Sequence, residues 1–364
     1  MLGDSLNNFF SKFFPTPYFL ASPSFGIDLS DDSLKFVELI GTKNGIKVNR
    51  YGERKIPAGI IESGKIKEPR RLQELLATLR KEEGIKFVRV SFPEDQIYLF
   101  KLRLGKSGLK SVREAIDLCL EEHIPIPAPD AIFDYELIEE TKDNLEIQVG
   151  AIPKNVIENY FNVFKNALMI VRSFEVEAQS IARAVIKKGD KDTYMIVDFG
   201  EKRTGIFIIS RGVVMFTSTL DIGGVVLNSM IQKSFNISYE EADMMKKEYG
   251  LKRNTDNKEI FAVILNSVSI LRDELAKHFL YWHTHQDEKG RNNPPIKKIL
   301  LCGGDSNLIG LADYFSISMN TKVEMANVWV NITGTNKNIP EINFKRALSL
   351  ASALGLALGN FDRT

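Results

Sequence analysis

Two aspartates stand at matching places in two similar stretches of the chain, and their surroundings suggest chemistry with a phosphorylated ligand. Asp28 lies in GIDLSDDSLKFVELI, and Asp198 lies in IVDFGEKRTGIFII. In each stretch an apolar run carries the aspartate, a short polar segment follows, and a second apolar run begins near Leu34 or Thr204, at the same offset. The pattern predicts two β-hairpins with a carboxylate near each turn, and it indicates an internal duplication.

A tight hairpin turn suits phosphate binding, because its backbone N–H groups can face the anion. A carboxylate beside the turn would repel phosphate, but it can hold a hydrated Mg²⁺ that bridges to the phosphate oxygens. A third turn, Gly303 and Gly304 in CGGDSNLIG, follows an apolar run and precedes a predicted helix. Because glycine permits close approach to a helix N-terminus, the three turns together predict a nucleotide site.

Three other motifs are weaker candidates for chemistry. LGKSG at 104–108 resembles part of a Walker phosphate loop, but that pattern needs glycine where Phe100 stands. His283 and His285 are two residues apart, so on a helix they point to different faces, and no further His or Cys is near them in the sequence. Cys302 has no base beside it in the sequence, which leaves only a base supplied by the fold.

The composition is that of a soluble globular chain with more than one lobe. Its 364 residues are 44% hydrophobic and 26% charged, and this length exceeds one ordinary core. Lys and Arg number 48 against 47 Asp and Glu, so there is no overall basic charge to favour nucleic acid. Two distant cysteines suit a reducing compartment, and no apolar run approaches the roughly 20 residues of a membrane span. We therefore expect a cytosolic protein.

The first 24 residues are distinguished by their phenylalanines and prolines. Leu and Phe at near-helical spacing precede a Pro-rich connector, and the basic start and continuous apolar run of a signal peptide are not found. We interpret this segment as a tail that folds onto the body, with contact to a partner or a membrane surface as the alternative.

The elements that must position the first hairpin are indicated up to Gly105. A helix is predicted over 68–84, because its leucines keep a 3.6-residue period between Pro69 and the stop at Gly84. Strands are predicted over 24–30, 33–41, 46–57, 85–93 and 96–104. Residues 25–105 are therefore expected to form a mixed α/β unit.

After Gly105 the pattern changes twice. A helix that ends at a proline cluster, two strands at 131–140 and 144–153, and a helix over 155–169 predict a small inserted α/β subdomain. The second meander follows over 192–220, and then helical segments, a strand with the Gly303 turn, and a last helix over 343–359.

The order of these motifs resembles one known family. GIDLSDDSLKFVEL, VREAIDLCLEEHIPIP, FEVEAQSIARAV, VDFGEKRTGIFII, LDIGGVVLN, YEEADMMKKEYG and ILLCGGDSNLIGLADYF occur in the order typical of the PilM family of type IV pilus assembly proteins, in the FtsA-like branch of the actin superfamily. The resemblance covers roughly 25–360. It implies an α/β, actin-like (ribonuclease H-like) duplicated two-lobe ATPase fold with an FtsA-type inserted subdomain.

The resemblance also implies how the chain divides. Residues 1–24 would be the tail, and the remaining parts would be a first lobe over 25–105, 173–190 and 340–360, an inserted interaction subdomain over 106–172, a second-lobe core over 191–225 and 294–339, and a helical subdomain over 226–293.

Site roles follow from the same resemblance. It implies Mg²⁺ held by Asp28 and Asp198, and a hydrolytic water oriented by Glu177 and Gln179 of EVEAQSIA. The implied phosphate-binding residues are Ser30, Asp31, Ser33, Lys35, Gly200, Glu201, Lys202 and Thr204. The implied nucleoside-binding residues are Gly223, Gly224, Asp243, Lys246, Gly303, Gly304 and Asp305.

The first hairpin departs from the family's pattern. Ser30 stands where the family usually has glycine, and Asp31 and Asp32 replace small hydroxylated residues. Two carboxylates beside a triphosphate weaken its binding unless they point away or meet the metal. We expect ATP and Mg²⁺ as ligands, with ATP hydrolysis slow or absent.

The resemblance implies a cytoplasmic protein, peripheral at the inner face of the cell membrane. Its main partner would be the cytoplasmic tail of a PilN-like inner-membrane protein, bound in a groove between the first lobe and the inserted subdomain. Nucleotide would change that groove by closing the lobes, provided that it binds the closed form better. The resemblance also implies other pilus-machine components as partners, but it does not imply nucleic acid. Contact with the membrane would be only peripheral, and self-association is possible.

Three rival interpretations remain. An FtsA-like division protein usually ends in a basic amphipathic helix, whereas this sequence ends soon after an apolar one. A sugar or acyl-phosphate kinase of the same superfamily would need an acid that acts on the substrate and no peptide-binding insert. A nucleotide-free pseudo-ATPase scaffold is favoured by the substitutions at Asp31 and Asp32.

Overall fold

The structure is a computed structural model that describes most of the chain. The described residues are 24–42, 45–92, 94–109, 111–252, 257–286, 290–332 and 342–361. The predicted N-terminal tail lies outside these residues except for Ser24.

The chain alternates strands and helices from end to end. The strands are β1 (Phe25–Leu29), β2 (Ser33–Thr42), β3 (Gly45–Lys55), β4 (Ile61–Glu62), β5 (Lys65–Ile66), β6 (Phe87–Phe92), β7 (Tyr98–Gly105), β8 (Ala131–Glu140), β9 (Asn144–Pro153), β10 (Ile170–Val176), β11 (Thr193–Phe199), β12 (Thr204–Ser210), β13 (Val213–Leu220), β14 (Ile296–Cys302) and β15 (Val323–Met325). The helices are α3 (Pro69–Glu83), α4 (Val112–His123), α5 (Lys154–Asn166), α6 (Glu177–Val185), α7 (Gly224–Phe235), α8 (Tyr239–Tyr249), α9 (Lys258–Thr284), α10 (Leu311–Ser318), α11 (Phe344–Leu348) and α12 (Ala351–Leu358), with short 3₁₀ turns η1 (Glu94–Gln96), η2 (Ala128–Asp130) and η3 (Asp305–Asn307).

Two five-stranded sheets share one arrangement of strands. The first has the order β10-β6-β1-β2-β3, and the second, β15-β14-β11-β12-β13. In each sheet three consecutive strands form an antiparallel meander and two later strands add in parallel. Asp28 pairs with Lys35 in the first sheet, and Asp198 pairs with Gly205 in the second. Because both hairpins have the same register, the structure confirms the predicted duplication.

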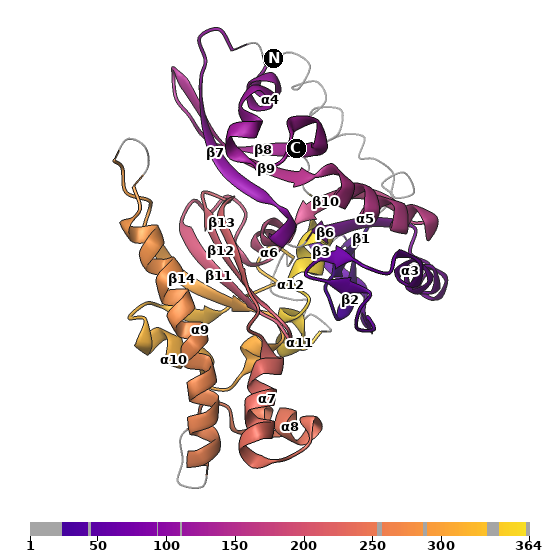
Figure 1. The fold of residues 1–364 in the computed structure, drawn as a ribbon, viewed down its shortest axis with the longest axis vertical. Coiled ribbons are helices and arrows are strands. Elements are labelled where there is room, and N and C mark those ends of the chain that lie inside the picture. Colours follow the sequence, from indigo (N-terminus) through magenta and orange to yellow (C-terminus); the bar gives the residue numbers. More distant parts are fainter. Residues whose placement is uncertain are drawn as a thin grey trace.

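The two sheets lie on either side of a central layer formed by two helices, α6 and α12 (Figure 1). Apolar residues of α6 and α12 pack in one core cluster with residues from both sheets, such as Leu39 and Phe207. The far face of the first sheet is covered by α3 and α5, and the far face of the second sheet by α7, α8, α9 and α10. The two lobes therefore share one continuous core through α6 and α12.

Close packing of α6 and α12 requires small residues. All eight residues of α12 are buried, and α12 also lies against β1. A Cβ atom on Gly355 would come 1.7 Å from the carbonyl oxygen of Ser180, and a Cβ atom on Gly26 would come 2.0 Å from the carbonyl oxygen of Ala353. Only glycine allows backbones to approach this closely.

The last helix differs from the prediction of one element over 343–359. The structure has α11 and α12 with a break at Ser349 and Leu350. Gly303 donates its N–H to the carbonyl oxygen of Leu348 (3.1 Å), while Ser349 and Leu350 donate to carbonyls three residues earlier, those of Arg346 and Ala347. A tertiary hydrogen bond thus occupies a carbonyl at the point where the helix breaks.

The third sheet belongs to the inserted part of the chain and has the order β7-β9-β8. Phe100, Leu102 and Leu104 of β7 pack with the apolar side of α4. The sequence placed β7 in the first lobe, at the end of 25–105, but β7 pairs with β9 along its whole length. The helical part over α7, α8 and α9 lies at the far end of the second lobe (Figure 1). Among the described residues no helix is long and apolar enough to cross a membrane.

The contact between α6 and α12 predicts a sharp difference between two glycines. Gly355→Ala should destabilise the fold by about 1–3 kcal/mol or more, because the new methyl group has no space beside Ser180. Gly105→Ala is the control, since no atom lies within 4 Å of its added Cβ. Urea unfolding followed by circular dichroism measures both free energies, and equal values for the two variants would contradict the packing.

Candidate functional site

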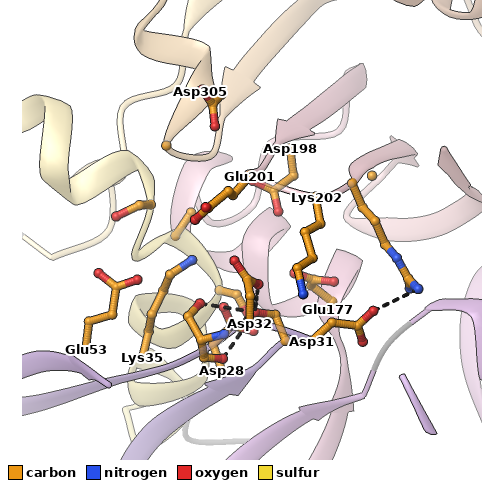
Figure 2. A pocket seen from close by; sticks show the side chains of 18 of the residues that line it. Asp28, Asp31, Asp32, Lys35, Glu53, Glu177, Asp198, Glu201, Lys202 and Asp305 are labelled. Carbon is orange, nitrogen blue, oxygen red and sulfur yellow. Dashed lines mark hydrogen bonds and ion pairs between the residues drawn. The ribbon is translucent and has the colours of Figure 1, made fainter. Parts of the chain in front are cut away.

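A polar cavity of about 530 Å³ lies between the lobes. The two hairpins face each other across this cavity, and the first residues of α6 and α12 form part of its wall. Its walls carry eleven Asp and Glu side chains and six Lys and Arg side chains. In Figure 2 the labelled side chains of the first lobe, such as Asp28 and Asp32, face those of the second, such as Asp198 and Glu201. Because carboxylates are in excess, a polyanion can enter only with compensating cations.

Most of the predicted site residues line this cavity. They are Asp28, Ser30, Asp31, Ser33, Lys35, Glu177, Asp198, Glu201, Lys202, Asp243, Lys246, Gly304 and Asp305. The remaining predicted site residues do not line the cavity: Gln179, Gly200, Thr204, Gly223, Gly224 and Gly303.

The turn of the first hairpin is closed by serine hydroxyls. Ser30 N–H donates to the carbonyl oxygen of Ser33 (2.9 Å), and Ser33 N–H donates to Ser30 Oγ (3.2 Å). The Ser30 hydroxyl in turn lies 2.9 Å from Asp32 Oδ1, to which it donates. Ser30 therefore fixes the turn from within and holds Asp32 at the cavity.

Asp31 points away from the centre of the cavity. Its two carboxylate oxygens accept the backbone N–H groups of Ser63 and Gly64, each at 3.0 Å, in the turn between β4 and β5. The guanidinium of Arg203, from the second hairpin, pairs with Asp31 (2.9 Å) and with Asp95 (2.7 Å). Asp31 is thus neutralised by Arg203 and by backbone N–H groups, and its ion pair with Arg203 joins the two lobes.

Asp32 stays in the cavity and faces the second hairpin. Burial and the nearby Asp32 carboxylate raise the pKa of Glu201. Lys202 extends from the same hairpin towards the first lobe (Figure 2). A hydrogen bond with Asp32 also raises the pKa of Glu201, so the two carboxyl groups face each other as a pair that can share a proton.

Asp28 and Asp198 both lie near enough to Lys35 to act on its charge. Asp28 is buried, and its Oδ1 accepts the Ser91 hydroxyl (2.8 Å). Burial alone would lower the pKa of Lys35, but Asp28, Asp198 and neighbouring carboxylates outweigh it and raise that pKa. Burial and the Asp28 charge raise the pKa of Asp198 to about 6, although Lys35 and a hydrogen bond with Cys302 act in the opposite direction. Lys35 is thus the cation that holds these carboxylates together.

Glu177 and Glu94 form the deepest acidic part of the site. Glu177 begins α6, and burial together with Asp28, Asp198 and Glu94 raises its pKa well above the usual range. One Glu94 oxygen accepts the N–H of Ala178 at the start of α6, and the other is buried without a described hydrogen-bond partner. Burial raises the pKa of Glu94 to about 8.

Glu94 lines the cavity but is not among the predicted site residues. It follows β6, the strand that runs parallel to β1 in the first sheet. Ligands of open α/β sheets bind at the carboxyl ends of such strands, so the PED segment after an apolar run was the available signal.

Gln179 lies outside the cavity. It is two residues beyond Glu177 on α6, a spacing that turns the side chains to different sides of a helix. Its amide donates to Glu136 of β8, and it lines a groove beside the third sheet. The structure therefore keeps Glu177, and not Gln179, as a candidate to orient water.

The second hairpin uses two predicted phosphate-binding groups internally. Gly200 N–H donates to the carbonyl oxygen of Arg203 (2.9 Å), and the buried Thr204 hydroxyl donates to the carbonyl oxygen of Ile222. A Cβ on Gly223 would come 2.4 Å from the carbonyl oxygen of Glu201, which explains glycine at that position. These residues shape the turn and do not line the cavity.

The predicted nucleoside side of the cavity is held by an ion-pair network. Lys246 of α8 is buried and pairs with Asp305 (2.6 Å) and Asp243 (3.3 Å). A Cβ on Gly224 would lie 2.2 Å from the Asp305 carboxylate, so glycine leaves space for that side chain. Gly303 has a φ of 89°, a left-handed conformation that favours glycine, and it places Gly304 on the cavity wall.

The donor set suits Mg²⁺ that keeps part of its water shell. Asp28, Asp198 and Glu177 offer the oxygen ligands that this ion prefers. Among the described residues no three acidic, His or Cys side chains are gathered closely enough to hold a metal directly. The residues therefore fit a hydrated ion bound together with phosphate.

Cys302 and His283, two other candidates for chemistry in the sequence, have structural roles instead. Burial and the Asp198 charge raise the pKa of Cys302 well above its usual range, which keeps the thiol protonated and unreactive. Both ring nitrogens of His283 have partners, the carbonyl oxygen of Phe279 (2.8 Å) and the N–H of Ile296 (3.2 Å).

Two lobes built on duplicated sheets, with a cavity between their hairpins, define an actin-like fold. The chain matches the model of a family described as type IV pilus assembly protein PilM over residues 26–361, and it belongs to this family.

Solved structures with the same fold are distant in sequence. A PilM-PilN type IV pilus biogenesis complex has a TM-score of 0.76 at 20% identity, with 94% of this chain and 99% of that chain covered. The ethanolamine utilization protein EutJ from Carboxydothermus hydrogenoformans has a TM-score of 0.55 at 15% identity, with 95% and 90% covered. An MreB5 of Spiroplasma citri bound to AMPPNP has a TM-score of 0.53 at 16% identity, with 92% and 94% covered.

The buried Glu94 predicts a stability that depends on pH. Its pKa of about 8 exceeds the usual 4.5, so the folded state holds a proton that the unfolded state releases between these values. Stability should therefore fall as pH rises from about 4.5 to about 8. Glu94→Gln keeps an acceptor for Ala178 and carries no titrating proton, so it should flatten the wild-type decline.

Urea unfolding of both proteins at pH 5 and pH 8, without nucleotide, measures the difference. Glu94→Gln should gain stability relative to wild type mainly at pH 8. An equal difference at both pH values would show that Glu94 is not held protonated.

Proposed function

We propose that this PilM-family protein binds ATP with Mg²⁺ in the interlobe cavity and binds the cytoplasmic tail of a PilN-like inner-membrane protein in a separate groove. The observation that carries the first part is the position of Asp28 and Asp198, which face each other from equivalent hairpins across one cavity. The similar MreB5 structure is bound to AMPPNP, which supports nucleotide as the ligand class.

The proposed roles follow from position and charge. Asp28 and Asp198 would hold the hydrated Mg²⁺, and Lys35 and Lys202 would balance the phosphates. The Gly304 turn and the Lys246 network would border the nucleoside. When bound, Mg²⁺ would supply the positive charge that lets a triphosphate lie among these carboxylates.

ATP hydrolysis is proposed to be slow because of the protonation state of Glu177. A residue that orients and deprotonates water must be ionised, whereas burial and three neighbouring acids favour the protonated form of Glu177. The lobes would then respond chiefly to whether nucleotide is bound, and not to its hydrolysis.

The proposed partner groove has a volume of about 380 Å³ and lies between the first sheet and the third. Phe92 and Phe174 of the first sheet and Leu99 and Ile152 near the third give it apolar walls, and Glu136 adds an acidic side chain. Cytoplasmic tails of membrane proteins carry an excess of Lys and Arg, which suits such a groove. The similar PilM-PilN complex supports a PilN-like tail as the occupant.

Two segments connect the cavity to the groove. In the first, Glu94 and Asp95 line the cavity, and Ile97 and Leu99 line the groove a few residues later. In the second, Glu177 faces the cavity while Gln179 faces the groove. The hydrogen bond between Glu94 and Ala178 ties these segments together, so closure of the lobes would change the groove walls.

The proposal places the protein in the cytoplasm at the inner face of the cell membrane, because its partner's tail continues into a membrane span. The division of the chain into two lobes, an inserted interaction subdomain and a helical subdomain is part of the same proposal. A nucleotide-free scaffold is the second candidate, and the facing carboxyl groups of Asp32 and Glu201 favour it.

The nucleotide claim predicts a specific effect of Asp198→Ala. Removal of one Mg²⁺-holding carboxylate should weaken Mg-ATP binding at least about tenfold in titration calorimetry. Asp192→Ala is the control, because Asp192 lies just before the same strand but is exposed and pairs with Lys297. No binding of Mg-ATP by the wild type would favour the scaffold.

The partner claim predicts that a larger side chain at Gly150 blocks the groove. Gly150 lies on β9 in the groove wall, and a Cβ there would make an ordinary 3.5 Å contact with Leu99. Gly150→Val should leave the fold stable and weaken binding of a fluorescent PilN-like tail peptide about tenfold or more, measured by anisotropy. Gly105→Val, at the end of β7 where space is open, is the control. Equal peptide affinity for both variants would place the tail elsewhere.

A further inference from the structure

The end of α5 and the adjoining strand starts carry exposed apolar side chains at one corner of the first lobe. Leu168 is 67% exposed, Ile170 is 45% exposed and Phe161 is 43% exposed. Ile170 pairs with Phe87 where β10 and β6 begin, and α3 lies beside α5 (Figure 1). We call Phe87, Phe161, Leu168 and Ile170 the apolar corner.

Leu168 is held outward in a conformation that disfavours leucine. Its φ is 60°, in the left-handed region where helix ends usually have glycine or asparagine. Its neighbours Ala167 and Met169 are both buried, and Met169 N–H donates to the carbonyl oxygen of Phe164 (3.0 Å). The turn is therefore fixed, and an exposed leucine at its tip has no benefit for folding.

Four cations surround the apolar corner. Arg80 donates to the carbonyl oxygen of Leu168 (3.0 Å), and the Lys165 ammonium lies 5.9 Å from the centre of the Phe161 ring. Lys86 and Arg172 lie over the Phe87 ring at 5.3 Å and 4.5 Å. No ion pair joins any of the four to a carboxylate of the described chain, and Glu82 and Glu83 at the end of α3 pair instead with Arg54.

We propose that the apolar corner contacts an anionic lipid surface directly. Cations around an exposed apolar tip match the two parts of such a surface, since Lys and Arg meet the headgroups while Leu, Ile and Phe enter the acyl boundary. A bilayer also needs no shaped pocket, and this corner is a projecting turn.

The position of the apolar corner relative to the bilayer agrees with the position of the proposed partner groove. This agreement rests on the proposed function. Ile157 lines the groove, and Phe161 of the apolar corner follows one turn later on α5. A tail that leaves the groove towards its membrane span would hold the end of α5 near the bilayer. The lipid contact would then add to the hold of the tail on the protein.

The test uses the full chain and vesicles, with neither nucleotide nor tail peptide. Wild type should sediment with vesicles of phosphatidylglycerol and phosphatidylethanolamine and not with phosphatidylcholine alone, and added salt should reduce the binding. Leu168→Asn should weaken binding roughly tenfold while thermal stability stays equal or rises, because asparagine accepts the left-handed backbone. Leu118→Asn, at an 87% exposed leucine on α4, is the control and should bind as wild type.

Charge variants complete the test. Lys165→Gln and Arg172→Gln should each weaken binding about fivefold, the effect of one cation near an anionic surface. Equal binding to both kinds of vesicle, or unchanged binding of Leu168→Asn, would overturn the proposal. A wild-type dimer in lipid-free sedimentation that Leu168→Asn dissociates would also overturn it, in favour of a second copy of the chain. Nucleotide and tail-peptide affinities in solution should not change, which separates this result from the proposed function.

Discussion

The burial of several carboxyl groups around one interlobe cavity is the constraint on which the rest of the structure depends. Asp28, Asp198 and Glu177 approach from three elements, and Lys35 is the cation placed among them. Burial raises the pKa of both Asp198 and Glu177, and the neighbouring acids add to this effect, while Lys35 acts against it. Burial therefore favours protons on these carboxyl groups, and a divalent cation is the kind of group that would compensate their charge instead.

The same constraint gives the cavity a mechanical connection to the groove. The carboxyl group of Glu94 lies among the acids and caps the first turn of α6 through Ala178. Arg203 reaches across the lobes to Asp31, and Asp31 binds the turn between β4 and β5. Of these two links, the one from Glu94 to Ala178 joins segments that also line the apolar groove. The duplicated sheets supply two rigid bodies, while α6 and α12 are the layer through which any movement must pass.

Much of this arrangement could be predicted from the sequence, because the hairpins repeat with one spacing and the helices have clear periods and stops. The strand β7 was predicted correctly but grouped with the first lobe, since an alternating strand does not specify its partner, and in the structure it pairs with β9. The last helix was predicted as continuous because the hydrogen bond from Gly303 that accompanies its break is tertiary. Gln179 was grouped with Glu177 by the family resemblance, whereas their spacing on α6 turns the two side chains to different sides of the helix. Glu94 was missed because its burial is not visible in a sequence, and the PED segment after an apolar run is a weak signal by itself.

The most direct test of the account measures Mg-ATP binding by titration calorimetry in two buffers that differ in ionisation enthalpy. We predict that ATP binds only when Mg²⁺ is present and that binding releases protons near pH 6, because the cation would displace the proton of Asp198, whose pKa is about 6. ATP binding of equal affinity in the presence of a chelator, or Mg-ATP binding without proton release, would contradict it.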